Sequence, residues 1–155
     1  MLMELAHYLL DQKGEDWSSL LRPWRWLLPA SFTIWMVNRF GEVIMVVEDG
    51  SVHRLDIGAG TLERVAESRE DFGARMDIDD NAGNWFMICL VDDCVAGNLH
   101  PGPGQCYAFR ILPSLGGEYS LENVMVASIR DYYEFSAQVH EQLRGVPDGT
   151  SVEIR

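Results

Sequence analysis

The sequence is short of positive charge. It has 12 Lys and Arg residues against 24 Asp and Glu residues in a chain of 155, so its formal net charge is −12. A molecule with this charge repels nucleic-acid phosphates and anionic membranes unless it carries a local basic patch. We therefore expect neither a nucleic acid nor a membrane as its partner.

Long hydrophobic runs and an export signal are also missing. No apolar run approaches the roughly 18 residues that a membrane span needs. The opening "MLMELAHYLLDQK" lacks the basic first region and the small-residue cleavage site of a signal peptide. We expect a chain with neither a signal peptide nor an anchor, located in the cytoplasm.

Cysteine is scarce, with three residues, Cys89, Cys94 and Cys106. An odd number without an export signal favours reduced thiols in a cytoplasmic protein. The metal-binding spacings CxxC, HxxxH and HExxH are absent, and Cys89 and Cys94 would lie about 140° apart around a helix. We expect no metal, although a site built from distant residues, such as His100 with Cys106, stays open.

Glycine-rich phosphate loops are missing too. The pair at residues 58–60 would need a third glycine at position 63, where Glu63 stands, and the pair at residues 102–104 would need one at Tyr107. Neither pair is followed by the Lys-Ser or Lys-Thr of a phosphate cradle. We interpret both pairs as turns and expect no cofactor.

His53 and Asp56 look at first like a catalytic pair. The segment that contains them follows the turn signal Asp49-Gly50 and has the composition of a strand, in which alternate side chains face opposite sides. His53 then lies on the side of Leu55, while Asp56 lies beside Arg54 on the other. The two cannot form a direct dyad, so no catalytic residue is predicted here.

What the sequence does contain is typical of an ordered globular protein. It is 47% hydrophobic and has five Trp residues. At this length one core suffices, since folding buries roughly 70% of the surface of the unfolded chain. We predict one domain over residues 1–155, with a helical lead-in at residues 1–30 and a core at residues 31–155.

Hydrophobic periodicity predicts an α+β fold: a mainly antiparallel sheet with helices packed against it. An amphipathic helix is expected in the first dozen residues, a short helical turn follows, and another helix begins after Ser68. A buried helix capped by Asn84 is expected over residues 84–97, and the last helix starts near Asp131. Strands are predicted at residues 31–40, 43–47, 51–57, 61–66, 106–112 and 122–129, with 151–155 as a possible sheet edge.

One segment concentrates the negative charge. Residues 67–93 contain eight acids and two arginines, a net −6, which is half of the total. The segment is either a solvated acidic helix with its loop or a docking face for a basic partner. Trp85 and Phe86 adjoin it as candidate anchors, although aromatics at helical spacing are more often core. The candidate partner-binding residues are Glu67, Glu70, Asp71, Asp77, Asp79, Asp80, Asp92 and Asp93.

Several short motifs resemble a known family. They are Phe40-Gly-Glu42, the Gly-x-Val-x-x-Leu-Asp run at residues 50–56, Ser68 with Phe72, Pro-Gly-Gln-Cys-Tyr at residues 103–107, and Gly116-Gly117. Together with their surroundings, at about residues 32–143, they resemble the C-terminal domain of immunity proteins that protect bacteria from type VI secretion DNase toxins.

The resemblance implies a bacterial, cytoplasmic, non-enzymatic protein that binds and neutralises a cognate toxin. It supplies no catalytic residues. A toxin that binds DNA is expected to be basic around its active site, so an acidic inhibitor would complement its charge.

Two other functions remain open. One is a small-molecule-binding or enzymatic domain with a pocket near the loop at residues 100–107 and the aromatics Trp35, Tyr107 and Tyr119. The other is a structural domain that self-associates through an apolar surface and forms a homo-oligomer.

Overall fold

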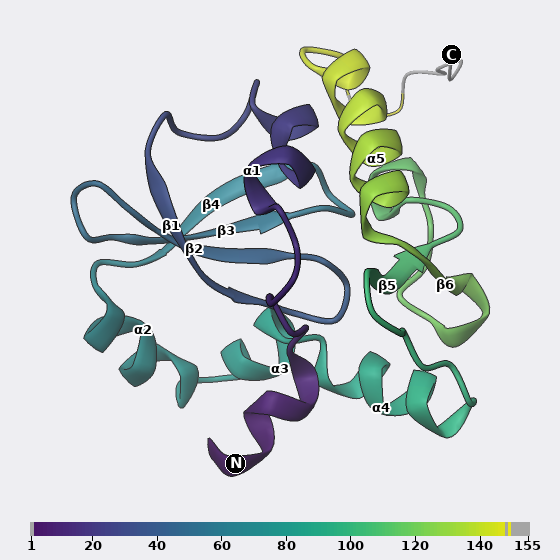
Figure 1. Ribbon diagram of the computed structural model, residues 1–155, viewed down its shortest axis with the longest axis horizontal. Helices are drawn as coiled ribbons and strands as arrows, with labels where there is room; N and C mark the ends of the chain where they lie inside the picture. The colour runs from purple at the N-terminus through teal and green to yellow at the C-terminus, as the bar shows by residue number, and fades with distance from the viewer. Residues whose placement is uncertain (1, 148, 150–155) are drawn as a thin grey trace.

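The computed structural model describes residues 2–147 and 149, with side chains from residue 5 onward. The possible edge strand at residues 151–155 lies outside the described residues. Two antiparallel sheets and a set of helices build an α+β fold, as predicted (Figure 1).

The larger sheet is a meander of four antiparallel strands in the order β1-β2-β3-β4. Its strands are β1 (Phe32–Val37), β2 (Val43–Val47), β3 (Val52–Asp56) and β4 (Thr61–Ala66). The predicted turn between β2 and β3 is confirmed: Gly50 has a φ of 86°, which favours glycine, and its N–H donates to the carbonyl of Val47 at 2.9 Å.

The smaller sheet pairs β5 (Gln105–Phe109) with β6 (Val124–Ser128), and the short helices η3 (Pro113–Leu115) and η4 (Leu121–Asn123) lie between them in sequence. The helix α5 (Ile129–Leu143) follows directly. It begins two residues before the predicted start because Ser128 caps it, accepting the N–H of Asp131 at 3.2 Å. Its apolar stripe packs against β5, β6 and the N-terminal segment.

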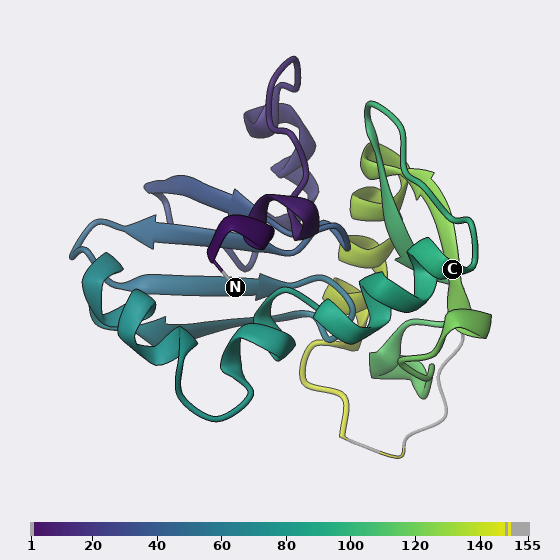
Figure 2. The same ribbon diagram turned by 90° about the horizontal axis from the view of Figure 1, so that it is seen from below.

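Three helices connect the two sheets: α2 (Arg69–Met76), α3 (Asn81–Trp85) and α4 (Ile88–Ala96). They form a row along one side of the molecule (Figures 1 and 2). The predicted cap of the first is confirmed, since the Ser68 hydroxyl accepts the N–H of Asp71 at 3.0 Å.

The single buried helix predicted over residues 84–97 is wrong. The helix is interrupted at Met87, whose φ of 55° is left-handed. Asn84 lies inside α3 and does not cap the start of a helix. The break turns Phe86 into a cluster with Ile44, whereas Val91 of the next helix packs into a separate cluster with Phe40. Two short helices that pack into different hydrophobic clusters therefore take the place of one continuous helix.

The N-terminal segment also departs from expectation. Instead of an amphipathic α-helix, residues Leu2–Tyr8 form the 3-10 helix η1. It ends there because Leu9 pairs with Asn38 and the N–H of Leu10 donates to Val37 at 2.8 Å, so the chain extends along the edge of β1. The short helices α1 (Trp17–Leu20) and η2 (Arg22–Trp24) follow, and the first confirms the predicted helical turn.

Candidate interaction surface

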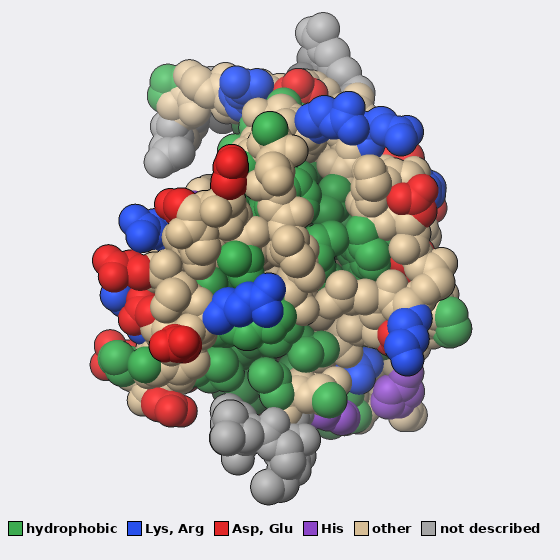
Figure 3. All heavy atoms as spheres, turned by 60° about the vertical axis from the view of Figure 1, so that its left-hand side comes forward, with side chains coloured by type: hydrophobic (Ala, Val, Ile, Leu, Met, Phe, Trp, Pro, Cys, Tyr) green, Lys and Arg blue, Asp and Glu red, His purple; other side chains and the backbone are tan. Residues whose placement is uncertain are grey.

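The eight acidic candidates lie along the row of helices rather than in one compact patch (Figure 1). Acidic side chains gather along one edge of the face shown in Figure 3. Seven of the eight are exposed, and Asp71 is half-buried. By position, Glu67 precedes α2, Glu70 and Asp71 lie in its first turn, Asp77, Asp79 and Asp80 lie in the turn before α3, and Asp92 and Asp93 lie in α4.

Two of these acids have intramolecular tasks. Asp71 accepts the N–H of Glu67 at 2.8 Å and pairs with Arg75 at 2.8 Å, and these contacts hold the pKa of its carboxyl below the usual value. Asp92 accepts the hydroxyl of Tyr8 at 2.8 Å, which ties α4 to the N-terminal segment. The other six form no ion pair with any described residue.

The basic residues of the segment do not cancel this charge at the turn before α3. The guanidinium of Arg69 lies over the ring of Trp35 on the sheet, 5.1 Å from its centre, and Arg75 is paired with Asp71. The turn therefore presents carboxylates that no described Lys or Arg side chain pairs with.

Ile78 is a residue that the sequence analysis missed. It lies in the turn between α2 and α3, among Asp77, Asp79 and Asp80, and is 52% exposed. A large aliphatic side chain with an acidic rim resembles the anchors that carry binding energy in protein interfaces. The signal in the sequence was a lone isoleucine inside an otherwise polar turn.

Trp85 and Phe86 are core residues and do not anchor a surface contact. Their exposures are 8% and 0%, and the ring of Trp85 stacks on Phe72 with centroids 4.7 Å apart. The ring of Phe72 also packs against the ring of Trp35, with 5.2 Å between their centroids. This aromatic cluster holds α2 and α3 against the larger sheet.

A buried polar network fixes the same region from the other side. The side-chain amide of Asn38 donates to the carbonyl of Trp85 at 3.0 Å and to the carboxylate of Glu42 at 2.9 Å. Its oxygen accepts the N–H groups of Phe40 and Glu42, both at 3.0 Å. One side-chain amide thus provides hydrogen-bond partners for backbone groups in the turn before β2 and at the end of α3.

Arg54 donates a hydrogen bond from Nη2 to Oε1 of Glu42 at 2.5 Å in this network, and both side chains are buried. Arg54 also contacts Asp56 at 3.3 Å and Glu63 at 3.6 Å. Burial raises the pKa of Glu42 to about 8, against the lowering effect of Arg54. The network links the turn before β2 with β3 and β4, and its acids outnumber its base.

The predicted separation of His53 from Asp56 is confirmed. Asp56 lies on the side of Arg54, whereas the ring of His53 is 3.5 Å from the hydroxyl of Ser51. The cysteines agree with a structural role for two of them: Cys94 and Cys106 are buried, and burial raises the pKa of Cys106 to about 12. Across the part of the chain that the structure describes, no three His, Cys, Asp or Glu residues lie close enough to hold a metal ion.

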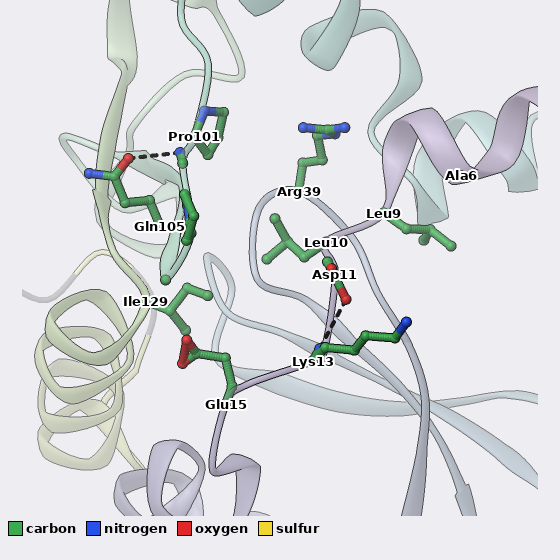
Figure 4. A pocket seen from close by; sticks show the side chains of 13 residues that line it. Ala6, Leu9, Leu10, Asp11, Lys13, Glu15, Arg39, Pro101, Gln105 and Ile129 are labelled. Carbon is green, nitrogen blue, oxygen red and sulfur yellow. Dashed lines mark hydrogen bonds between the residues drawn. The ribbon is translucent and has the colours of Figure 1, made fainter.

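A pocket does lie beside the loop at residues 101–105, with a volume of about 630 Å³. Figure 4 shows Pro101 and Gln105 on one wall and Leu10, Arg39 and Lys13 on the opposite one. The aromatics expected there do not line it. Trp35 packs on Phe72, Tyr119 packs on Phe109, and the hydroxyl of Tyr107 donates to the carbonyl of Leu99 at 2.6 Å.

One histidine is paired with a serine. The Nε2 of His140 lies 2.7 Å from the hydroxyl of Ser114, and its Nδ1 lies 2.8 Å from the carbonyl of Ser136. A Cβ on Gly60 would meet the imidazole at 2.2 Å, so the ring is clamped between the turn before β4 and the helix. Burial lowers the pKa of His140, which favours the neutral ring. These contacts attach the turn at η3 to α5.

The comparisons with known proteins place this arrangement in context. Residues 66–140 match the family model described as T6SS immunity protein Tdi1, C-terminal. This match to an immunity family confirms the resemblance predicted from the sequence motifs. It covers just under half of the chain and includes all eight acidic candidates.

No curated protein matches the chain. Among solved structures, the chain is similar to the protein in "Crystal structure of Atu4351 from Agrobacterium tumefaciens", with 18% sequence identity and a TM-score of 0.46. The superposition covers 72% of this chain and 56% of that one. The described residues contain no helix that is both long and apolar enough to cross a membrane.

The motifs on which the resemblance rests have structural tasks. Within residues 66–140, Ser68 caps α2, Phe72 is buried, and Gly117 lies so close to the carbonyl of Ile111 that a Cβ would clash with it. Phe40 and Glu42 precede the matched region and are buried as well. These motif residues therefore build the scaffold of this protein.

Proposed function

We propose that this protein binds and neutralises a cognate bacterial toxin in the cytoplasm, and that it acts by occlusion and not as an enzyme. The observation that carries the proposal is the match of residues 66–140 to a type VI secretion immunity family. The three free cysteines, two of them buried, suit a reducing compartment.

We further propose that the toxin is basic and nuclease-like, and that it docks on the acidic row from α2 to α4. The segment holds half of the net charge in 27 residues, and seven of its eight carboxylates have no ion pair among the described residues. The charge of carboxylates without an ion pair is not neutralised by a neighbouring cation. Their negative potential speeds encounter with a basic surface and disfavours acidic partners.

Ile78 can contribute binding free energy that exposed charges do not. Exposed ion pairs contribute little free energy each, whereas an aliphatic anchor that enters a pocket contributes through burial. In this mechanism Asp77, Asp79 and Asp80 orient the toxin and Ile78 holds it.

The test begins with co-purification of the protein with the products of neighbouring genes, followed by measurement of Kd across salt concentrations. We expect tight binding that weakens as NaCl rises. The variant Asp77→Lys/Asp79→Lys/Asp80→Lys should weaken binding roughly 100-fold, which is about 3 kcal/mol.

A matched control separates the face from the total charge. Glu118→Lys/Glu134→Lys/Glu141→Lys makes the same change in net charge at exposed positions on α5 and the loop before η4. It should alter Kd only a few-fold. Equal losses of affinity from both triple variants would refute the proposed binding face but not the proposal that the protein binds a toxin.

A further inference from the structure

A second surface of the molecule is apolar and carries the opposite charge. The segment at residues 12–30 and strand β1 enclose a groove of about 800 Å³, which is within the usual range for small-molecule sites. Figure 3 shows hydrophobic side chains in a hollow, with basic side chains along its upper rim. The apolar lining comes mainly from Trp17, Leu21, Leu28, Pro29, Phe32 and Ile34.

Two arginines are the only ionisable side chains in the described lining of this groove, Arg22 and Arg25. Both are exposed, and neither takes part in an ion pair with a described residue. A groove lined by two cations and no anion is unusual in a chain where acids outnumber bases two to one.

The local backbone places these two guanidinium groups on one side. Arg22 begins the 3-10 helix η2 and Arg25 caps its end, with the N–H of Arg25 donating to the carbonyl of Arg22 at 3.1 Å. Side chains three residues apart on a 3-10 helix lie one above the other. Trp24, between them in sequence, is fully buried and holds the turn against the core.

We propose that this groove binds an amphiphilic carboxylate, a medium-chain fatty acid. The acyl chain would lie along the apolar lining near Phe32 and Ile34, and the carboxylate would accept hydrogen bonds from Arg22 and Arg25. Arginine presents paired N–H donors that match the two oxygens of a carboxylate. This site is separate from the acidic row and does not depend on toxin binding.

The experiment titrates the full chain with dodecanoate, below its critical micelle concentration, by isothermal titration calorimetry. We expect one molecule bound per chain. Decanoate and octanoate should bind more weakly, by roughly fourfold for each CH₂ group removed. Saturable binding that does not depend on chain length would overturn the apolar half of the proposal, as would no binding.

Dodecyltrimethylammonium tests the charged half. The net charge of −12 favours this cation over dodecanoate in the field of the whole molecule, whereas Arg22 and Arg25 favour the anion at the groove. Preference for dodecanoate therefore reports the local site. Equal or tighter binding of the cation would show that the groove is merely apolar and would overturn the proposal.

Variants complete the test. Arg22→Gln/Arg25→Gln should weaken dodecanoate binding at least tenfold and leave the circular dichroism spectrum unchanged, because both side chains are exposed. The control Arg64→Gln/Arg110→Gln removes two exposed arginines outside the groove and should leave affinity within twofold. Equal affinity of the groove variant and the wild type would refute the assignment.

Discussion

The side-chain amide of Asn38 donates to the main-chain carbonyl of Trp85 at 3.0 Å, across 47 residues of sequence. This bond joins the turn before β2 to the end of α3, where the helical row bends toward α4. The acidic surface therefore rests on a polar contact in the core of the molecule.

Replacing Asn38 with alanine should lower the free energy of unfolding by about 2–4 kcal/mol. The change leaves the carbonyl of Trp85 and the N–H groups of Phe40 and Glu42 buried without partners. Urea unfolding measures the loss. Asn84→Ala is the control, because Asn84 is exposed, and its effect should stay within about 0.5 kcal/mol.

Glu42→Gln should change how stability depends on pH. The folded-state pKa of Glu42 is raised to about 8 by burial, above the ordinary 4.5, so the folded protein holds a proton that the unfolded chain releases between these values. The stabilisation from that proton is complete below pH 4.5 and is lost as pH rises through 8. The wild type should therefore lose up to about 1.4 kcal/mol per pH unit relative to Glu42→Gln in this window. Urea titrations of both proteins at about pH 5, 6, 7 and 8 measure the difference, and parallel pH profiles would contradict it.

Two glycines should respond in opposite directions to alanine. Gly73 lies in α2 without a positive φ, and a methyl group there would meet open space, so Gly73→Ala should stabilise the protein by about 0.5–1 kcal/mol. A Cβ on Gly117 would sit 1.8 Å from the carbonyl oxygen of Ile111, and Gly117→Ala should destabilise it by several times that amount. Thermal unfolding of both variants tests the prediction. A Gly117→Ala protein as stable as the wild type would show that this loop adapts freely.

Ile78→Ser should leave folding unchanged and weaken binding of the proposed toxin partner. The side chain is 52% exposed, so stability should change by less than about 0.5 kcal/mol, whereas loss of an interface anchor costs about 2 kcal/mol or more of binding free energy. The loss should appear as faster dissociation. Ile111→Ser removes a similarly exposed isoleucine elsewhere and serves as the control. If both variants dissociate at the wild-type rate, Ile78 is not the anchor.

Local features of this protein were predictable from its sequence because their causes span only a few residues. The Asp49-Gly50 turn, the Ser68 cap and the alternation that separates His53 from Asp56 each depend on neighbouring residues alone. The α+β class follows from such local periods added along the chain.

Tertiary contacts decided the rest. Apolar residues at helical spacing around Phe86 do not reveal that Met87 breaks the helix, because the break serves two clusters built from distant strands. The same limit hid the buried Glu42–Arg54 pair and the exposure of Ile78. Composition determined that the molecule is acidic, but only packing determined which carboxylates stay unpaired, because burial and pairing depend on partners that the fold brings from far along the chain.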